Sequence, residues 1–191
     1  MDTARYIIAI VLVCWAPPSF CLWFLVHPFV HFWRRISPVA TITILGVLFL
    51  MGGGYFVYLR ESLLGADLGS DISLIILAIL AYIISARIYV LRKKHLTVSI
   101  MLGVPEMTGG GILLTKGIYG RIRHPRYVEV WIGTFAYAAF ANYVGAWIVW
   151  LALGPLLHLI VLLEERELLH RFGSEYEKYQ KCVGRYLPKR G

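Results

Sequence analysis

Charged residues are scarce in this chain of 191 residues, where they make up only 16% of the total. A soluble domain usually carries about 25% charged residues and about 45–50% apolar ones. Here 59% of the residues are hydrophobic. The shortage of charge argues against an ordinary soluble domain and predicts an integral membrane protein embedded in a lipid bilayer.

Cysteines and acidic residues are also few. The three cysteines, Cys14, Cys21 and Cys182, are odd in number and scattered, so we expect free thiols, no disulfide framework and no metal site. Lysine and arginine outnumber aspartate and glutamate by 19 to 11, for a net charge of +8. Nucleic-acid binding is one explanation, but the basic residues gather at the ends of apolar runs, as topology signals do. We therefore expect contact with anionic lipid and no nucleic-acid partner.

Apolar runs of spanning length organise the chain. A membrane-spanning helix needs about 20 mostly apolar residues. Pro17-Pro18 is expected to interrupt and kink the first run, because proline removes a backbone donor. The last apolar stretch is too long for one span and divides at a turn, residues 141–145. We predict an all-α polytopic membrane protein with about five transmembrane helices, at residues 6–26, 38–58, 72–91, 127–141 and 145–163.

The residues after the last span change in character. From 164 to 179, apolar residues recur at helical spacing opposite charged ones, which predicts a C-terminal amphipathic helix. The basic segments all fall on one side of the predicted spans, so the positive-inside rule places the N-terminus outside and the C-terminus in the cytosol. We expect one integrated domain, with three spans in residues 1–95 and the catalytic region in residues 96–191. The sequence indicates no oligomeric state.

One polar stretch, residues 117–127, lies between two apolar blocks. It carries three arginines, including Arg123, whose forked donors suit a carboxylate or phosphate. His124 donates or accepts a hydrogen bond near neutral pH. Pro125 disfavours the α conformation at His124, so the backbone there is expected to be extended and to face a ligand. The alternative is a positive-inside loop at a helix start, with Pro125 in the first helical turn.

Carboxylates form the second polar signal. Glu164 and Glu165 end the last apolar run, where adjacent carboxylates are costly unless cations or donors pair with them. We expect this pair to meet the polar stretch and build one cytosolic site; an ordinary helix exit into water is the alternative. Glu129 lies just inside the fourth predicted span and is a functional candidate for that reason. Its alternative role is a salt bridge to Arg126 or Arg123.

Two blocks of residues form a recognisable signature, with a hairpin of spans between them. The first block is Gly117-x-Tyr119-x-x-x-Arg123-His124-Pro125-x-Tyr127. The second block is Glu164-Glu165-x-x-Leu168-x-x-x-Phe172-Gly173-x-x-Tyr176-x-x-Tyr179, followed by Arg185 and Pro188. Over roughly residues 111–188, the pair resembles the isoprenylcysteine carboxyl methyltransferase and phospholipid methyltransferase superfamily.

The resemblance implies S-adenosylmethionine as cofactor and methyl donor, in a cytosol-facing pocket capped by the tail helix. The acceptor is then a lipophilic or membrane-embedded small molecule. We place the catalytic positions at Glu129 and Arg123. The cofactor contacts implied by the family fall on Tyr119, His124, Pro125, Tyr127 and Glu164, with Glu165 in support and Gly111, Ile112, Leu113 and Leu114 along the cofactor's border.

Two departures from the family pattern bear on the acceptor. Carboxyl-methylating members carry an arginine where this chain has Ile160, so a carboxylate substrate loses its expected partner. Many members have glycine where this chain has Glu129, and an acid there suits a cationic acceptor. We therefore expect a lipid amine, a thiol or a similar acceptor, ahead of the carboxyl group of isoprenylcysteine. A nicotinamide-dependent enzyme of the sterol-reductase branch and a non-enzymatic membrane component are the remaining alternatives.

Overall fold

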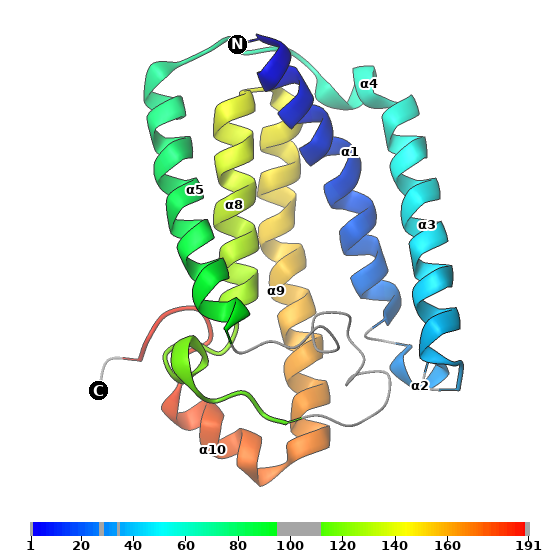
Figure 1. Ribbon diagram of the computed structural model, residues 1–191, viewed down its shortest axis with the longest axis vertical. Coiled ribbons are helices and arrows are strands. Elements are labelled where there is room, and N and C mark those ends of the chain that lie inside the picture. Colours follow the sequence, from blue (N-terminus) through cyan, green and yellow to red (C-terminus); the bar gives the residue numbers. More distant parts are fainter. Residues whose placement is uncertain (1, 27–28, 34, 95–111, 190–191) are drawn as a thin grey trace.

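Long helices run between two ends of the molecule and form one bundle (Figure 1). This computed structural model describes residues 2–26, 29–33, 35–94 and 112–189. Gly111, one of the predicted site residues, lies outside the described residues. In chain order the elements are α1 (Asp2–Val26), α2 (Val30–Trp33), α3 (Pro38–Tyr58), α4 (Arg60–Leu64), α5 (Ile72–Lys93), η1 (Gly117–Gly120), α8 (Pro125–Ala141), α9 (Val144–Phe172) and α10 (Ser174–Cys182).

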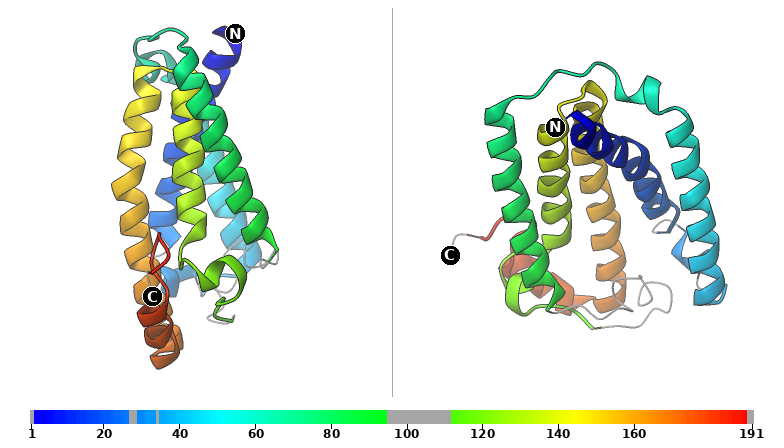
Figure 2. Two further views of the ribbon diagram at one scale, coloured as in Figure 1. Left: turned by 90° about the vertical axis from the view of Figure 1, so that its left-hand side faces the viewer. Right: turned by 45° about the horizontal axis from the view of Figure 1, so that its top comes forward.

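Among the described residues, four helices are long and apolar enough to cross a membrane: α1, α3, α5 and α9. They bear out the predicted helical membrane architecture in its general form. Helix α8 has 17 residues, which at 1.5 Å per residue is about 25 Å, against a hydrocarbon core of about 30 Å. It packs against α1, α5 and α9, and both views show it running beside α5 and α9 (Figures 1 and 2). A fifth span at α8 stays a prediction.

Helix α1 continues through Pro17 and Pro18, so the predicted interruption is wrong. Proline is tolerated inside membrane helices where neighbouring helices support the backbone. Here α3 provides that support through its glycines. A Cβ atom built on Gly52 would lie 3.0 Å from the Cβ of Pro18, and one on Gly53 would lie 2.4 Å from the ring of Trp15. These glycines therefore allow the two helices to approach closely.

The turn between α8 and α9 is tied to the loop before α5. Asn142 ends α8 with φ +53°, a left-handed conformation that asparagine adopts more readily than most residues. The Asn142 carbonyl accepts a hydrogen bond from the amide of Leu68 at 3.0 Å, and the amide of Val144 donates to the Ala66 carbonyl at 3.0 Å. The predicted turn at residues 141–145 is confirmed, and it is held by chain from another part of the sequence.

A buried arginine holds this end of the bundle together. Arg5 of α1 is 2% exposed. Its Nε donates to the Ala141 carbonyl at 3.1 Å, and its terminal amino groups pair with Asp67 and Asp2. The guanidinium also lies over the ring of Tyr143, 5.6 Å from its centroid. We call Arg5, Asp67, Ala141 and Tyr143 the Arg5 clamp, because it joins α1, the 65–71 loop and the α8–α9 turn.

Helix α9 continues past Glu164 and Glu165 to Phe172. A separate helix was predicted to begin at residue 164, and this predicted starting residue is therefore wrong. The break comes at Gly173, where φ is +53°, and α10 follows. Glycine adopts this conformation without the steric cost that a Cβ atom brings. Tyr176 is the buried residue of α10, while its charged residues are exposed.

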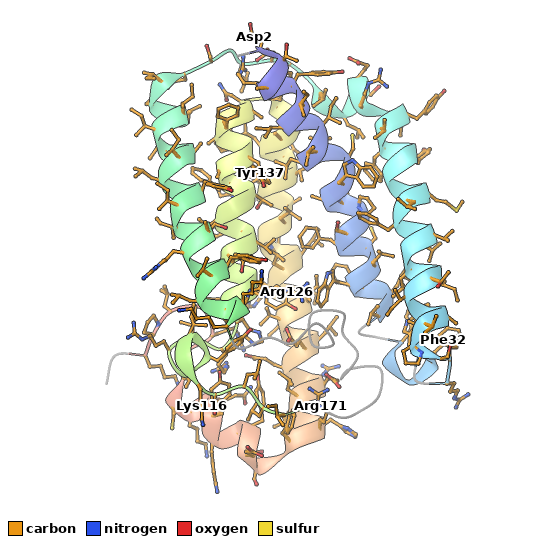
Figure 3. All side chains as sticks on the ribbon, viewed as in Figure 1. Asp2, Phe32, Lys116, Arg126, Tyr137 and Arg171 are labelled. Atoms are coloured by element: carbon orange, nitrogen blue, oxygen red, sulfur yellow. The ribbon has the colours of Figure 1, made fainter. Side chains whose placement is uncertain are left out.

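The two ends of the bundle differ in what they carry. The N-terminus, α4 and the α8–α9 turn lie at one end, and η1 and α10 lie at the other (Figures 1 and 2). Lys116, Arg126 and Arg171 lie toward the end opposite Asp2 (Figure 3). Arg5 lies at the other end, with Asp67 and Ala141, and the direction in which the protein faces across a membrane stays a prediction.

Candidate active site

The polar stretch enters α8 through a tight turn. It begins with η1, whose first residue, Gly117, has φ +62°. His124 has φ −121° and ψ 58° and precedes Pro125, the first residue of α8. Pro125 thus keeps His124 out of the α region, as the sequence predicts. It also occupies the first helical turn, where its missing N–H costs nothing.

The C-terminal tail pairs with this stretch through its backbone. The amide of Arg123 donates to the Gly184 carbonyl at 2.8 Å, and the amide of His124 donates to the Arg185 carbonyl at 3.1 Å. Between η1 and α10, the hydroxyl of Tyr179 donates to the Tyr119 carbonyl at 2.6 Å. The tail therefore lies over the loop, as the resemblance implies, and the backbone pairing with Gly184 and Arg185 is the part that the sequence patterns do not predict.

Glu165 is the centre of a buried ionic cluster. Its Oε1 accepts from Nε and a terminal amino group of Arg123 at 3.1 and 2.7 Å. A terminal amino group of Arg185 reaches Oε2 at 2.6 Å. The ring Nε2 of His124 lies 3.1 Å from Oε1. We call Glu164, Glu165, Arg123, His124 and Arg185 the Glu165 cluster. It brings together both predicted halves of the site, with Glu165 more central than expected.

The imidazole of His124 lies between two carboxylates. Its Nδ1 is 3.5 Å from Oε2 of Glu164, and its Nε2 faces Glu165. Burial opposes a charged imidazole, but hydrogen bonds and charge from Glu164 and Glu165 outweigh burial and raise the pKa of His124 above its usual value. The arrangement favours a doubly protonated ring that donates to both carboxylates.

Arg123 is engaged on every side of its guanidinium. Besides Glu165, it donates to the carbonyls of Gln180 and Val183 at the end of α10. Its side chain is 8% exposed. The observed contacts give Arg123 a positioning role between the loop, α9 and the tail. A catalytic role for it stays a prediction.

Tyr119 lies near charges of both signs. Burial raises the pKa of its phenol to about 12, with further effects from the cations Arg92 and Arg126 and the carboxylates Glu164 and Glu129. The neutral phenol is therefore a hydrogen-bond donor at physiological pH. Two cations and two carboxylates around one phenol make an environment suited to a ligand that carries both charges.

Glu129 forms an ion pair that the sequence does not predict. Its carboxylate receives Nε and a terminal amino group of Arg92, from α5, at 2.7 and 3.2 Å. The predicted alternative partners, Arg126 and Arg123, are wrong. Arg126 instead lies over the ring of Trp23, 4.4 Å from its centroid. The charge of Glu129 is thus balanced within the bundle, and its catalytic role stays a prediction.

The remaining predicted residues differ in burial. Pro125 and Tyr127 are buried, and the ring of Tyr127 lies 5.7 Å from that of His124. Leu113 and Leu114 are half-buried, whereas Ile112 is 75% exposed. Ile160 is fully buried in an apolar cluster with Tyr127, Leu157 and Val161. Its contribution there is apolar packing.

Sequence reasoning missed two arginines of this region. Arg92 sits in the last turn of α5, and its position at the end of an apolar run made it look like a topology signal. Arg185 was noted as part of a motif, but no ion pair was predicted for it. The carboxylates were the signal that could have revealed these arginines, because each acid at a membrane boundary requires a cation.

The fold and the cluster define a helical protein with candidate membrane spans and a buried ionic site at one end. The "Protein-S-isoprenylcysteine O-methyltransferase" of Schizosaccharomyces pombe is 33% identical to this chain over 78 residues. That alignment covers 40% of this chain and 33% of the yeast protein, so it spans about a third of that protein's length. Neither a protein-family model nor a solved structure matches the chain.

Proposed function

We propose that this protein is an integral membrane methyltransferase that uses S-adenosylmethionine and methylates a lipophilic acceptor. The observation that carries the proposal is the Glu165 cluster, in which His124 lies between Glu164 and Glu165 at the end of apolar helices. The partial similarity to a yeast methyltransferase supports the reaction class. Three residues of the cluster, His124, Glu164 and Glu165, are among those that the family resemblance assigns to the cofactor.

The chemistry of the site fits this cofactor. S-adenosylmethionine carries an ammonium, a carboxylate, a ribose and an apolar adenine. The carboxylate of Glu164 suits the ammonium or the ribose, while Tyr119 and the nearby cations suit the carboxylate. Leu113 and Leu114, which are half-buried, suit the adenine. When bound, the cofactor would supply a methyl group on a sulfonium sulfur, which is a good leaving group because it departs as a neutral thioether.

The protein's own contribution is positioning and exclusion of water. Glu165, held by Arg123 and Arg185, orients the ring of His124. His124 in turn places Glu164, and the tail closes the loop through the carbonyls of Gly184 and Arg185. A fixed site of this kind accelerates a displacement by holding the reactants in the productive geometry.

The acceptor follows from two positions. Ile160 is buried and apolar, which disfavours a carboxylate acceptor at that point. Arg92 already balances the charge of Glu129. The attraction of Glu129 for a cationic acceptor is therefore weakened by this ion pair. We favour a lipid amine, a thiol or a similar group. Carboxyl methylation of an isoprenylcysteine is the second candidate, because the similar yeast protein is named for that reaction.

The test is cofactor binding and methyl transfer with purified protein. Wild type should bind S-adenosylmethionine in preference to NADPH and transfer labelled methyl groups into a fractionated membrane lipid extract. Glu164→Gln and His124→Ala should each weaken cofactor binding by at least tenfold, because both remove groups next to the proposed cofactor. The matched control is Glu175→Gln, an exposed acid of α10, which should bind as wild type. Binding of NADPH alone, or equal binding by all the variants, would overturn the proposal.

A further inference from the structure

An apolar groove lies beside the candidate active site. It has a volume of about 520 Å³, within the range of small-molecule sites. Helix α8 contributes Tyr127 and Trp131, helix α9 contributes Gly154, Leu157 and His158, and the tail contributes Tyr186. The described residues that line it include no lysine, arginine, aspartate or glutamate. Its chemistry therefore suits hydrocarbon.

The groove lies along an apolar span. Helix α9 is one of the helices long and apolar enough to cross a membrane. Trp131, which lines the groove, has an apolar side chain that is 43% exposed. Hydrocarbon chains of the bilayer are the surroundings that such side chains require. A lipid chain is therefore the occupant best matched to this surface.

A single polar pair interrupts the apolar lining. Nδ1 of His158 and the hydroxyl of Tyr186 form a hydrogen bond of 2.8 Å. This bond joins α9 to the tail that follows α10. No described residue forms a hydrogen bond with the other ring nitrogen, Nε2. A few fixed polar groups in an apolar site commonly orient the ligand.

The groove adjoins the Glu165 cluster. Tyr127 lines the groove, and its ring lies 5.7 Å from that of His124. Tyr186 directly follows Arg185, which binds Glu165. His158 precedes Glu164 by six residues, which is about 9 Å along a helix. A ligand in the groove would thus share both a wall and a tail segment with the ionic cluster.

We propose that this groove binds the hydrocarbon chain of the methyl acceptor, and that His158 recognises an uncharged hydrogen-bonding group on it. The identification of the bound lipid as the methyl acceptor rests on the proposed function. The acceptor is then a lipid with one long chain that carries a hydroxyl or similar neutral group within the groove. Its amine or thiol lies outside the groove, because a charged group there would lie unpaired among apolar residues. His158 is a specificity residue, and Tyr186 positions its ring.

The experiment uses the full chain in lipid nanodiscs, without S-adenosylmethionine. The probes are a bromine-tagged long-chain alcohol and the bromoalkane of equal length, both of which quench tryptophan fluorescence. Trp131 lines the groove and reports on its occupant. Wild type should bind the alcohol about three- to tenfold more tightly than the alkane, the gain of one net hydrogen bond.

The variants separate the polar pair from the groove. His158→Leu should abolish the preference for the alcohol, and Tyr186→Phe, which removes only a hydroxyl, should reduce it. Gly154→Leu should weaken the binding of both probes, because it fills the groove. Leu159→Phe, on an exposed residue outside the lining, should change neither.

The proposal would be overturned by no preference for the alcohol in wild type, or by the same preference in His158→Leu. Quenching that Gly154→Leu leaves unchanged would also overturn it, since the probes would then be in bulk lipid. These results are distinct from failure of the proposed function. A protein that fails to bind S-adenosylmethionine and yet discriminates the alcohol through His158 would lose the methyltransferase assignment alone.

Discussion

The two ends of the bundle each bury an ionic cluster, and the two clusters are built in opposite ways. In the Arg5 clamp, one arginine is held by Asp67 and by a backbone carbonyl. In the Glu165 cluster, one carboxylate is held by Arg123, His124 and Arg185. Both clusters join segments that are distant in the sequence.

The two clusters differ in the groups that lie beyond them. Arg5 contacts the loop and the turn that it joins. The Glu165 cluster continues through His124 to Glu164, and Glu164 lies within electrostatic reach of Tyr119. A buried charge therefore does not mark a functional site by itself. A cluster that extends to further titratable groups has the means to bind a charged ligand.

The largest expected effect comes from Glu165→Gln. The change leaves two guanidiniums without their counter-charge, and breaking a buried ion pair costs about 3–5 kcal/mol. We expect a lower thermal midpoint in detergent together with loss of S-adenosylmethionine binding, measured on the same preparation. An intact cofactor affinity in the variant would show that the cluster is structural, like the Arg5 clamp.

Arg5→Met should lower stability and leave the site unchanged. The orphaned Ala141 carbonyl alone costs about 1–3 kcal/mol, because a buried acceptor loses its donor. Thermal unfolding should shift downward, while the cofactor affinity of the folded fraction should equal that of wild type. Reduced affinity at temperatures well below the transition would show that the two ends are coupled.

Two glycines offer a matched comparison of smaller effect. A Cβ atom at Gly145 would lie 1.9 Å from the carbonyl oxygen of Leu63, and one at Gly184 would lie 1.9 Å from that of Leu187. Gly145→Ala should lower the thermal midpoint only. Gly184→Ala displaces the tail that closes on Arg123, so it should also weaken cofactor binding. The same effect on affinity from both changes would contradict the division between the ends.

The smallest expected effect is the dependence of stability on pH. The pKa of His124 is raised above 6.5, with the carboxylates of Glu164 and Glu165 outweighing burial. Its stabilisation is therefore complete below pH 6.5 and is lost as pH rises through the raised value. The pKa of Asp67 is lowered from 3.8 by hydrogen bonds from Gly69 and Arg5, so its stabilisation is lost as pH falls below that value.

Thermal midpoints measured across pH should therefore decline on both sides for different reasons. His124→Gln should flatten the alkaline decline and leave most of the acid decline, because hydrogen bonds from Arg185 and Arg123 still lower the pKa of Glu165 against its burial. Asp67→Asn should reduce the acid decline only. If either variant alters both sides equally, the two clusters do not titrate independently.

Apolar periodicity and turn residues predicted much of the fold. The helix at residues 38–58 matches α3, and Asn142 marks the observed turn. The meeting of the His124 loop with Glu164 and Glu165 was also predicted, and the contacts confirm it. These features follow from local composition and from the cost of unpaired carboxylates at a membrane boundary.

The partners within the clusters were not predictable in the same way. Glu164 and Glu165 are separated by about 100° around the helix, since one turn holds 3.6 residues. Which of them faces the loop depends on how α9 packs. Arg5 and Arg92 stand at the ends of apolar runs, where a pairing arginine and a topology signal look alike. Tertiary packing decides between them, and no local pattern encodes it.

The backbone pairing of the tail with Arg123 and His124 has a consequence for biogenesis. Arg185 leaves the ribosome after every other residue of the Glu165 cluster. Until then, Glu165 lacks one of its two guanidiniums. The cluster is therefore assembled last, so a correctly threaded chain acquires its site only when its tail has folded back on it.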